Sequence, residues 1–166
     1  MYSYYGEEGL SKIRNLFTYT TQESFFFEGS LQDNLLISNF EDKAEELEKL
    51  NKIRDYLLKF DLKNILERDF TLQQPLNLAL DFYSGGEKKR LALIRSFVRD
   101  KGIEIYDEPT SYLDEKGSIK IINFLKERSR EKIIIVSSHD QKLIDVADKV
   151  IDIGDLNHLI SSIRKT

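Results

Sequence analysis

The sequence has 166 residues, of which 40% are hydrophobic and 33% are charged, so it can bury a substantial core and differs from a disordered chain. The formal net charge of −4 argues against a broad nucleic-acid-binding surface, and the lack of cysteine excludes disulfides and thiolate metal sites and fits a cytosolic location. No apolar run approaches the roughly 18 residues of a membrane-spanning helix, so we expect any membrane role to involve a partner.

The first half of the chain predicts one strand followed by helices. Residues 15–21 are β-branched and aromatic, which is typical of a strand. Ser30, with Asp33 three residues later, is a suitable N-cap for a short helix. Farther along, apolar residues recur at helical spacing. The helices expected in this half cover residues 30–36, 41–59 and 62–67, and the segment 71–81 fits neither pattern.

The second half alternates between helices and strands, which indicates a parallel sheet with crossover connections. Glu104 is unusual, because buried parallel strands are normally apolar throughout. We therefore expect that its strand lies near a sheet edge or lacks a packing partner. The expected helices cover residues 88–98, 118–128 and 141–147, and the expected strands cover residues 103–107, 133–137 and 150–153.

Ser84, Gly85 and Gly86 stand at the start of the helix expected over residues 88–98. The two glycines lack Cβ atoms, so their backbone N–H groups can approach a ligand closely. A helix N-terminus also attracts anions. The same three residues would equally form an ordinary turn and helix cap, so their weight as a binding motif depends on the motifs that follow.

Asp107 and Glu108 follow one apolar strand, and His139 follows the next. Ligands of α/β proteins gather at the carboxyl ends of strands. One carboxylate can hold Mg²⁺, and its neighbour can orient or deprotonate a water that attacks a phosphoryl group. The histidine can donate a hydrogen bond to a phosphate oxygen. Taken singly, the acidic pair and the histidine could also be ordinary loop residues.

Taken in order, these motifs resemble the ATP-binding domain of ABC transporters, of the exporter-like type. The resemblance runs from about Leu16 to Gly154. Its segments are residues 21–35, similar to the Q-loop region; 83–87, similar to the LSGGQ signature; 103–108, similar to the Walker B strand with its catalytic glutamate; 111–114, similar to the D-loop; and His139, similar to the switch histidine.

The resemblance implies a role for each residue. Asp107 would coordinate Mg²⁺, Gln22 would touch the metal or the attacking water, and Glu108 would polarise that water. His139 would contact the γ-phosphate of ATP. The groups that would bind ATP held by a partner domain are Ser84, Gly85, Gly86 and Glu87 of the signature and Asp114 of the D-loop.

The resemblance also implies an α/β fold, with a partial RecA-like parallel sheet, flanking helices and an inserted helical subdomain that carries the signature motif. We expect residues 1–40 and 84–166 to form the ATPase core and residues 41–83 to form the helical subdomain. Residues 25–27 either fill space between these parts or receive a cytoplasmic helix of a transporter. The implied partners are a transmembrane subunit or domain and a second ABC domain, in a homo- or heterodimer at the cytoplasmic face of the membrane.

One motif of the family does not occur. None of the eight glycines precedes a lysine, so the sequence contains no G-x-x-x-x-G-K-[ST] phosphate loop, the Walker A motif that lies N-terminal to the Q-loop in this family. We therefore expect the isolated chain to bind ATP weakly and to hydrolyse it negligibly. It would be a truncated or split transport ATPase domain, or a non-catalytic or regulatory partner that donates its signature to another ABC subunit.

A DNA-repair or SMC-like ATPase is a less favoured alternative. Residues 84–88 and 107–110 match that class as well. Its members separate their two lobes by long coiled coils, whereas only about 60 residues lie between Gln22 and Ser84 and they contain no heptad run.

Overall fold

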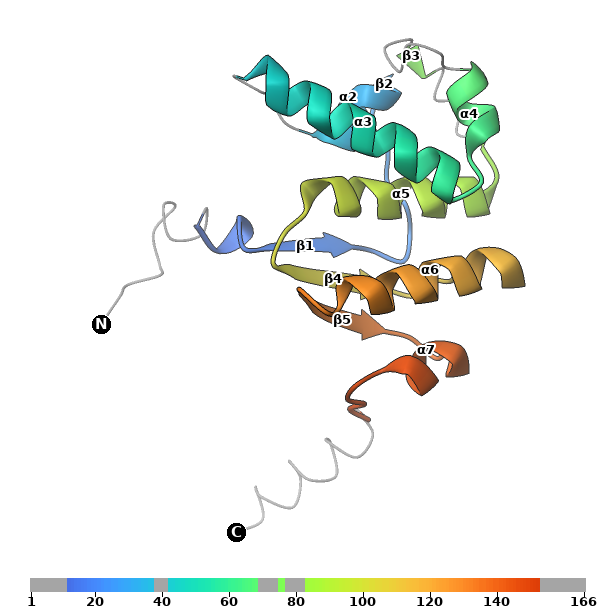
Figure 1. Cartoon of the computed structure of the whole chain (residues 1–166). Helices are drawn as coiled ribbons and strands as arrows, with labels where there is room; N and C mark the ends of the chain where they lie inside the picture. The colour runs from blue at the N-terminus through green and yellow to red at the C-terminus, as the bar shows by residue number, and fades with distance from the viewer. Residues whose placement is uncertain (1–11, 38–41, 69–74, 77–82, 153–166) are drawn as a thin grey trace.

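A three-stranded parallel sheet lies at the centre of the protein, in the order β1–β4–β5 (Figure 1). The structure is a computed structural model that describes residues 12–37, 42–68, 75–76 and 83–152. The register pairs Tyr19 with Ile105 and Ile105 with Ile135. The strands are β1 (Phe17–Thr20), β4 (Ile103–Asp107) and β5 (Ile133–Ser137).

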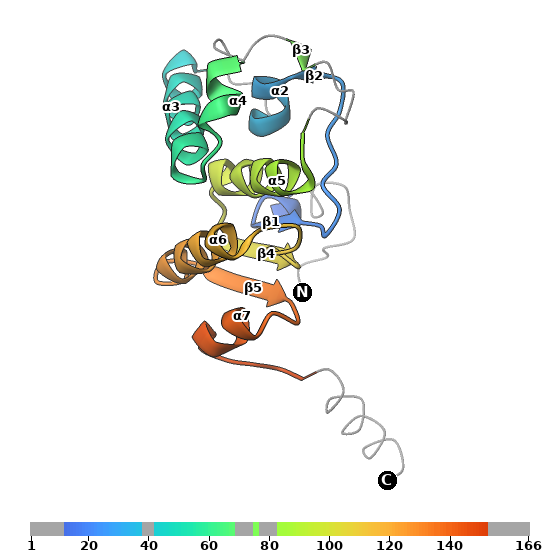
Figure 2. The same ribbon diagram turned by 90° about the vertical axis from the view of Figure 1, so that its right-hand side faces the viewer.

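Helix α5 (Gly85–Arg99) lies between the sheet and a group of helices (Figures 1 and 2). That group consists of α2 (Leu31–Leu36), α3 (Lys43–Lys59) and α4 (Lys63–Arg68), with the short antiparallel pair β2 (Gly29–Ser30) and β3 (Pro75–Leu76) beside it. On the other side of α5, helix α6 (Glu115–Arg128) packs on the sheet and α7 (Gln141–Val146) follows β5. None of the described helices is both long enough and apolar enough to cross a membrane.

Most of the predicted elements are confirmed, with shifts of a few residues at their ends. The predicted cap of the first short helix is also confirmed, because the Ser30 hydroxyl accepts from the Asp33 backbone and the Asp33 side chain accepts from the Ser30 backbone in a capping box. The prediction of a strand over 150–153 is wrong for the described residues Val150, Ile151 and Asp152. They are exposed and pair with no described strand, and β-branched residues form a strand only where a partner accepts their backbone bonds. Residue 153 lies outside the described part, as do most of residues 71–81.

Aromatic side chains fill the space between α3, α5 and α6. Phe97 of α5 lies at the centre of the cluster. Its ring centroid is 4.8 Å from that of Phe124, 5.7 Å from that of Phe60 and 5.8 Å from that of Tyr56. The contacts of Phe97 with Phe124 and Tyr56 are edge-to-face and the one with Phe60 is tilted, and such contacts add to the free energy gained by burial. The cluster therefore joins the helical group to the sheet layer, both through Phe97 of α5 and through direct contacts of Tyr56 and Phe60 with Phe124 of α6.

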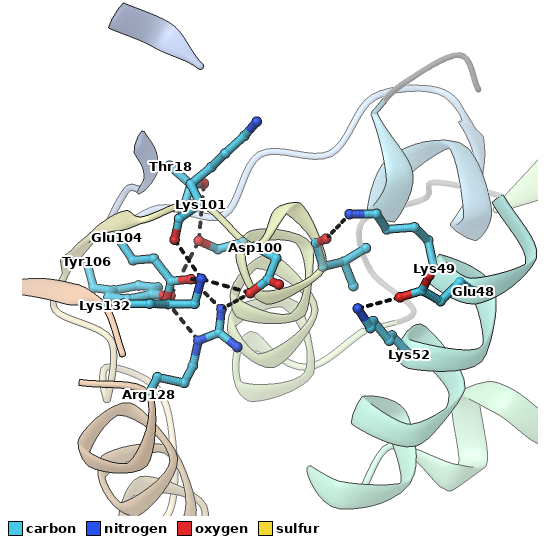
Figure 3. Close-up of polar contacts among 12 residues, drawn as sticks. Thr18, Glu48, Lys49, Lys52, Asp100, Lys101, Glu104, Tyr106, Arg128 and Lys132 are labelled. Atoms are coloured by element: carbon cyan, nitrogen blue, oxygen red, sulfur yellow. Dashed lines mark hydrogen bonds and ion pairs between the residues drawn. The ribbon is translucent and has the colours of Figure 1, made fainter. Parts of the chain in front are cut away.

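The expectation for Glu104 is wrong, since its strand is not at an edge of the described sheet and the face that carries Glu104 does not lack a packing partner. β4 is the middle strand, and the Glu104 side chain is 0% exposed because it has a packing partner, Arg128 of α6 (Figure 3). The Arg128 guanidinium donates to both carboxylate oxygens, from Nε at 2.9 Å and from Nη2. The Tyr106 hydroxyl donates to the same carboxylate at 2.7 Å. A buried charge is tolerated when it is paired and hydrogen-bonded in this way.

The Glu104–Arg128 pair is part of a larger network at the N-terminal end of β4 (Figure 3). Asp100, which ends α5 in a left-handed conformation, accepts from Arg128 Nη2 at 2.9 Å and lies 3.0 Å from Lys132 Nζ. Although burial opposes its charge, the Glu104 carboxylate raises the pKa of Arg128. Burial and Glu104 also raise the pKa of Tyr106, so this hydroxyl remains a proton donor. The network thereby ties α5, α6 and β4 together.

The second face of the sheet carries exposed apolar side chains. Ile133 and Ile135 of β5 are 59% and 50% exposed. Tyr19 of β1 lies on the same face, because it pairs with Ile105 of β4, which in turn pairs with Ile135. The face that carries Thr18, Glu104 and Tyr106 is by contrast buried beneath α5 and α6. Among the described residues, the sheet is thus packed on one face, while the other face exposes apolar side chains of β1 and β5.

We predict that Arg128→Met lowers the free energy of unfolding by about 3–5 kcal/mol, because it leaves the Glu104 carboxylate buried without its counter-charge. The double variant Glu104→Met/Arg128→Met should be more stable than Arg128→Met alone, since no unpaired charge remains. Urea unfolding of the wild type, both single variants and the double variant measures the coupling. Additive losses in this cycle would contradict the pairing.

Candidate functional site

The motif residues converge on one edge of the sheet. The carboxyl ends of β1, β4 and β5 point to the same side of the molecule, and the N-termini of α5 and α6 lie on that side as well (Figure 1). Parallel strands that alternate with helices produce this arrangement, because each strand is followed by a return helix. Residues far apart in the sequence are therefore gathered at one edge.

Glu108 and His139 are in direct contact. The ring nitrogen Nδ1 of His139 lies 2.7 Å from Glu108 Oε1, and the His139 backbone N–H donates to the same oxygen at 3.2 Å. The Ser138 hydroxyl donates to Oε2 at 2.9 Å. Because a carboxylate only accepts, Nδ1 carries the hydrogen of this bond and Nε2 is left to face solvent. The parallel pairing of β4 with β5 places the two loops side by side.

These bonds keep the Glu108 carboxyl ionised. Burial alone would raise its pKa, but the bonds from His139 and Ser138 outweigh burial and lower the pKa below the ordinary value of 4.5. The backbone of Glu108 is left-handed, with φ of 45°, and its N–H donates to the carbonyl of Ser137 at 2.8 Å. A non-glycine residue rarely adopts this conformation, and such strain is common at functional sites.

Asp107 and Gln22 lie close together, although their side chains share no bond. The ammonium of Lys89 donates to the backbone carbonyl of Gln22 at 3.2 Å and to that of Asp107 at 3.1 Å. The end of β1 and the end of β4 are therefore joined through α5. Gln22 itself is exposed, which leaves its side-chain amide accessible to a ligand.

Asp107 fits the role of a Mg²⁺ ligand. Among the described residues, no side chain donates a hydrogen bond to its carboxylate, which stands at the carboxyl end of the middle strand. The described residues also hold no group of three or more His, Asp and Glu side chains that could bind a metal unaided. Mg²⁺ commonly takes one or two carboxylates, with water and phosphate oxygens as its other ligands. A single free carboxylate is consistent with that requirement.

The signature residues form the first turn of α5. The Ser84 hydroxyl accepts from the Glu87 N–H at 3.2 Å, and Glu87 Oε2 accepts from the Ser84 N–H at 2.8 Å. Asn64 of α4 donates to the other oxygen of Glu87 at 2.8 Å. Burial raises the pKa of Glu87, but these bonds outweigh burial and the pKa is lowered. Glu87 therefore acts as a capping residue whose charge is already bound by donors.

The signature lies against the D-loop of the same chain. A Cβ atom on Gly86 would stand 2.9 Å from the backbone oxygen of Tyr112, and one on Gly85 would touch the Tyr112 ring at 3.4 Å. Tyr112 is itself left-handed, with φ of 65°. Glycine at position 86 is thus required by a close backbone approach.

Asp114 lies at the N-terminus of α6 and caps that helix. Its carboxylate accepts from the Gly117 N–H at 2.8 Å, and the side chain is exposed. The structure brings Glu108 to His139, Gln22 to Asp107 and the signature to Tyr112, but within the described residues no hydrogen bond joins the Asp114 side chain to another predicted site residue. Its predicted role toward a partner's nucleotide stays a prediction.

Sequence reasoning missed two residues of this edge. Ser138 adjoins His139, and its hydroxyl completes the bonding of Glu108. Lys89 is completely buried, and a signal for this was present in its spacing to Ala92, Leu93 and Ser96, which follows the buried face of α5. A lysine in the run Lys88-Lys89-Arg90 suggests a solvated surface, so the helical period was the better guide.

Comparisons with known proteins identify the family of the chain. A family model for the ABC transporter matches residues 4–111. The lactococcin-G-processing and transport ATP-binding protein LagD of Lactococcus lactis subsp. lactis is 34% identical over 146 residues, which are 84% of this chain and 19% of LagD. The putative hemin import ATP-binding protein HrtA of Staphylococcus aureus strain Newman is 35% identical over 92 residues, 54% of this chain and 42% of HrtA. The chain therefore spans less than half of either relative.

The fold agrees as well. A solved structure of a bacterial Atm1-family ABC exporter with ATP bound matches with a TM-score of 0.65 and 20% identity, over 81% of this chain and 23% of that chain. At this identity the likeness concerns the fold alone. The family model covers well over half of the sequence, and its match includes the Q-loop region, the signature and the Walker B strand. The chain belongs to the ABC transporter family.

Proposed function

We propose that this chain supplies the signature, the Walker B carboxylates and the switch histidine of an ABC-type ATPase, and acts on ATP together with a second ABC domain that provides the phosphate loop. The contact between Glu108 and His139 carries this proposal. It provides an ionised carboxylate and an oriented imidazole at the edge where a phosphoryl group would be placed.

In this proposal Glu108 holds the attacking water and takes up a proton as the water attacks. The lowered pKa means that Glu108 is ionised at neutral pH, so a carboxylate oxygen can accept a hydrogen bond from the water. His139 is held by its Nδ1–H, so its Nε2 side is available to the γ-phosphate. Asp107 would hold Mg²⁺, with Gln22 near the metal or the water, and when bound the ion neutralises charge on the phosphate oxygens.

The signature would act on the nucleotide of the partner domain. The Ser84 side chain is exposed, and the helix N-terminus behind it carries partial positive charge. Asp114 on the neighbouring loop would lie at the same interface. The partner could be a second copy or a different ABC subunit. The chain would work at the cytoplasmic face of a membrane, through a transmembrane subunit.

Residues 25–27 support a contact with that subunit. The Phe25 side chain is 73% exposed, whereas Phe26 is buried beneath the Arg95 guanidinium, which lies 4.7 Å from the ring centroid. Arg95 also donates to the carbonyl of Phe25 at 2.8 Å and to that of Asn34 at 2.7 Å. The loop thus presents an apolar side chain on a firmly held backbone.

We predict that the isolated chain shows no Mg²⁺-dependent ATP turnover and no ATP binding at micromolar concentration. Turnover should appear when it is mixed with an ABC domain that has a phosphate loop and whose own signature serine is replaced by arginine, and Ser84→Arg should abolish it. Phosphate release and equilibrium dialysis provide the measurements. Micromolar affinity with turnover by the chain alone would refute the prediction.

A matched pair of variants separates this role of Ser84 from helix capping. Ser30 and Ser84 cap α2 and α5 through the same type of capping box. Ser30→Ala and Ser84→Ala should each cost about 1 kcal/mol of stability. Only Ser84→Ala should reduce turnover of the mixture, and an equal loss in both variants would point to stability alone.

A further prediction concerns Glu108. Because its pKa is lowered in the folded protein, the carboxylate contributes stability that is fully present above pH 4.5 and is lost as the pH falls through the lowered pKa. The difference in unfolding free energy between wild type and Glu108→Gln should therefore be largest near neutral pH and shrink below pH 4.5. Urea unfolding between pH 3 and pH 7 measures it, and a difference that does not vary with pH would contradict the assigned bonds.

In the mixture described above, Glu108→Gln should lower turnover by about 10²–10⁴-fold, the usual contribution of a general base. This result also decides between the two forms of the proposal. If the chain only donates its signature to the partner's site, turnover should be unaffected by Glu108→Gln and remain sensitive to Ser84→Arg.

A further inference from the structure

Lys89 is buried without a counter-ion. Its side chain is 0% exposed, although it lies on α5 only five residues after the N-cap Ser84. The ammonium has three N–H donors, and three backbone carbonyls accept from it: Thr21 at 3.3 Å, Gln22 at 3.2 Å and Asp107 at 3.1 Å. Every donor is therefore used.

The Lys89 ammonium lies near the carboxylates of the candidate site without pairing with them. The pKa of Lys89 is lowered, because burial outweighs the attraction of Asp107 and Glu108, which alone would raise it. Among the described residues, no carboxylate comes within ion-pair distance of the Lys89 ammonium. A buried lysine that bonds only to carbonyls is costly to maintain, so its contacts with three particular backbone groups require an explanation.

Those carbonyls belong to two separate segments. Thr21 and Gln22 follow β1, whereas Asp107 ends β4, and the bonds are made across 68, 67 and 18 residues of sequence. The lysine itself belongs to the helix that begins with the signature. One side chain thus joins three motifs that are separated along the chain.

We propose that Lys89 is a positioning residue, an inference that rests on the proposed function. Lys89 holds the Gln22 segment against Asp107 and links both to the signature helix. It fixes the distance between the two groups expected around Mg²⁺. It also transmits a displacement of α5 to them, because the ammonium is held by carbonyls on both sides. Lys89 touches no substrate and acts only through Gln22 and Asp107.

Lys49 provides a matched control. It also bonds α5 through a backbone carbonyl, that of Val98 at 3.0 Å, but at the opposite end of the helix. Lys49→Met and Lys89→Met each remove a lysine that donates to a carbonyl and leave an unbranched apolar side chain. Only the second removes a link between the Q-loop and the end of β4.

The first test uses nuclear magnetic resonance of the full chain without nucleotide. The wild type should show a slowly exchanging lysine ammonium signal correlated with the carbonyl carbons of Thr21, Gln22 and Asp107. Order parameters of the Gln22 and Glu23 amides should be about 0.85 in the wild type and in Lys49→Met, and should fall below about 0.6 in Lys89→Met.

Absence of the ammonium correlation, or unchanged order parameters in Lys89→Met, overturns the proposal. If Lys89→Met does not fold, the wild-type correlation decides on its own, and Lys89→Gln provides a second, shorter side chain that retains an amide donor. The expected order parameters of Lys89→Gln lie between those of the wild type and Lys89→Met.

The second test uses the mixture with the phosphate-loop-bearing domain. Lys89→Met should raise the Mg²⁺ concentration for half-maximal turnover about tenfold, with the KM for ATP at saturating Mg²⁺ unchanged. If Lys89→Met only destabilised the fold, it would reduce the fraction of active protein but leave the Mg²⁺ concentration for half-maximal turnover and the KM for ATP unchanged. That result would overturn a positioning role. If the wild-type mixture shows no turnover, the proposed function fails, and the resonance experiment still decides on Lys89.

Discussion

The buried ion pair between Glu104 and Arg128 is the interaction on which the arrangement of the site depends. It joins the middle strand to helix α6, and the Asp100 bond extends it to the end of α5. The chain segment between β4 and α6 contains Glu108 and the D-loop, so the pair sets how that segment must turn. A buried pair of this kind adds little net stability compared with apolar residues. Its contribution here is geometric, since the bonds from Nε and Nη2 of Arg128 to the two Glu104 oxygens fix the place of α6 over β4.

The sequence predicted the elements and the order of the motifs well, because helical periodicity, capping residues and strand-end acids are local signals. Ser84 is identifiable as a cap from its neighbour Glu87, and Asp107 from the apolar strand before it. The parallel sheet followed from the alternation of helices and strands. These features require knowledge of neighbouring residues only.

What could not be predicted depends on pairing across the chain. From the sequence alone, Glu104 is incompatible with a buried strand, because its partner Arg128 is 24 residues later in the chain. Residues 150–152 have the composition of a strand, but a strand also needs a partner to accept its backbone bonds. Lys89 has the period of a buried position, yet nothing local indicates which carbonyls receive its donors. Long-range partners decide these cases.

Helix α5 explains how distant parts of the site can respond together. Its first turn holds the signature against Tyr112, Lys89 in the second turn bonds both strand ends, and Arg95 holds the Phe25 loop. A helix is stiff along its axis, because each backbone bond restricts the next turn. Under the proposed function, a displacement at its N-terminus would be transmitted to the Gln22 segment and to the exposed Phe25. Coupling between a nucleotide bound by the partner domain and a membrane subunit would then need no hinge between the signature and the Q-loop.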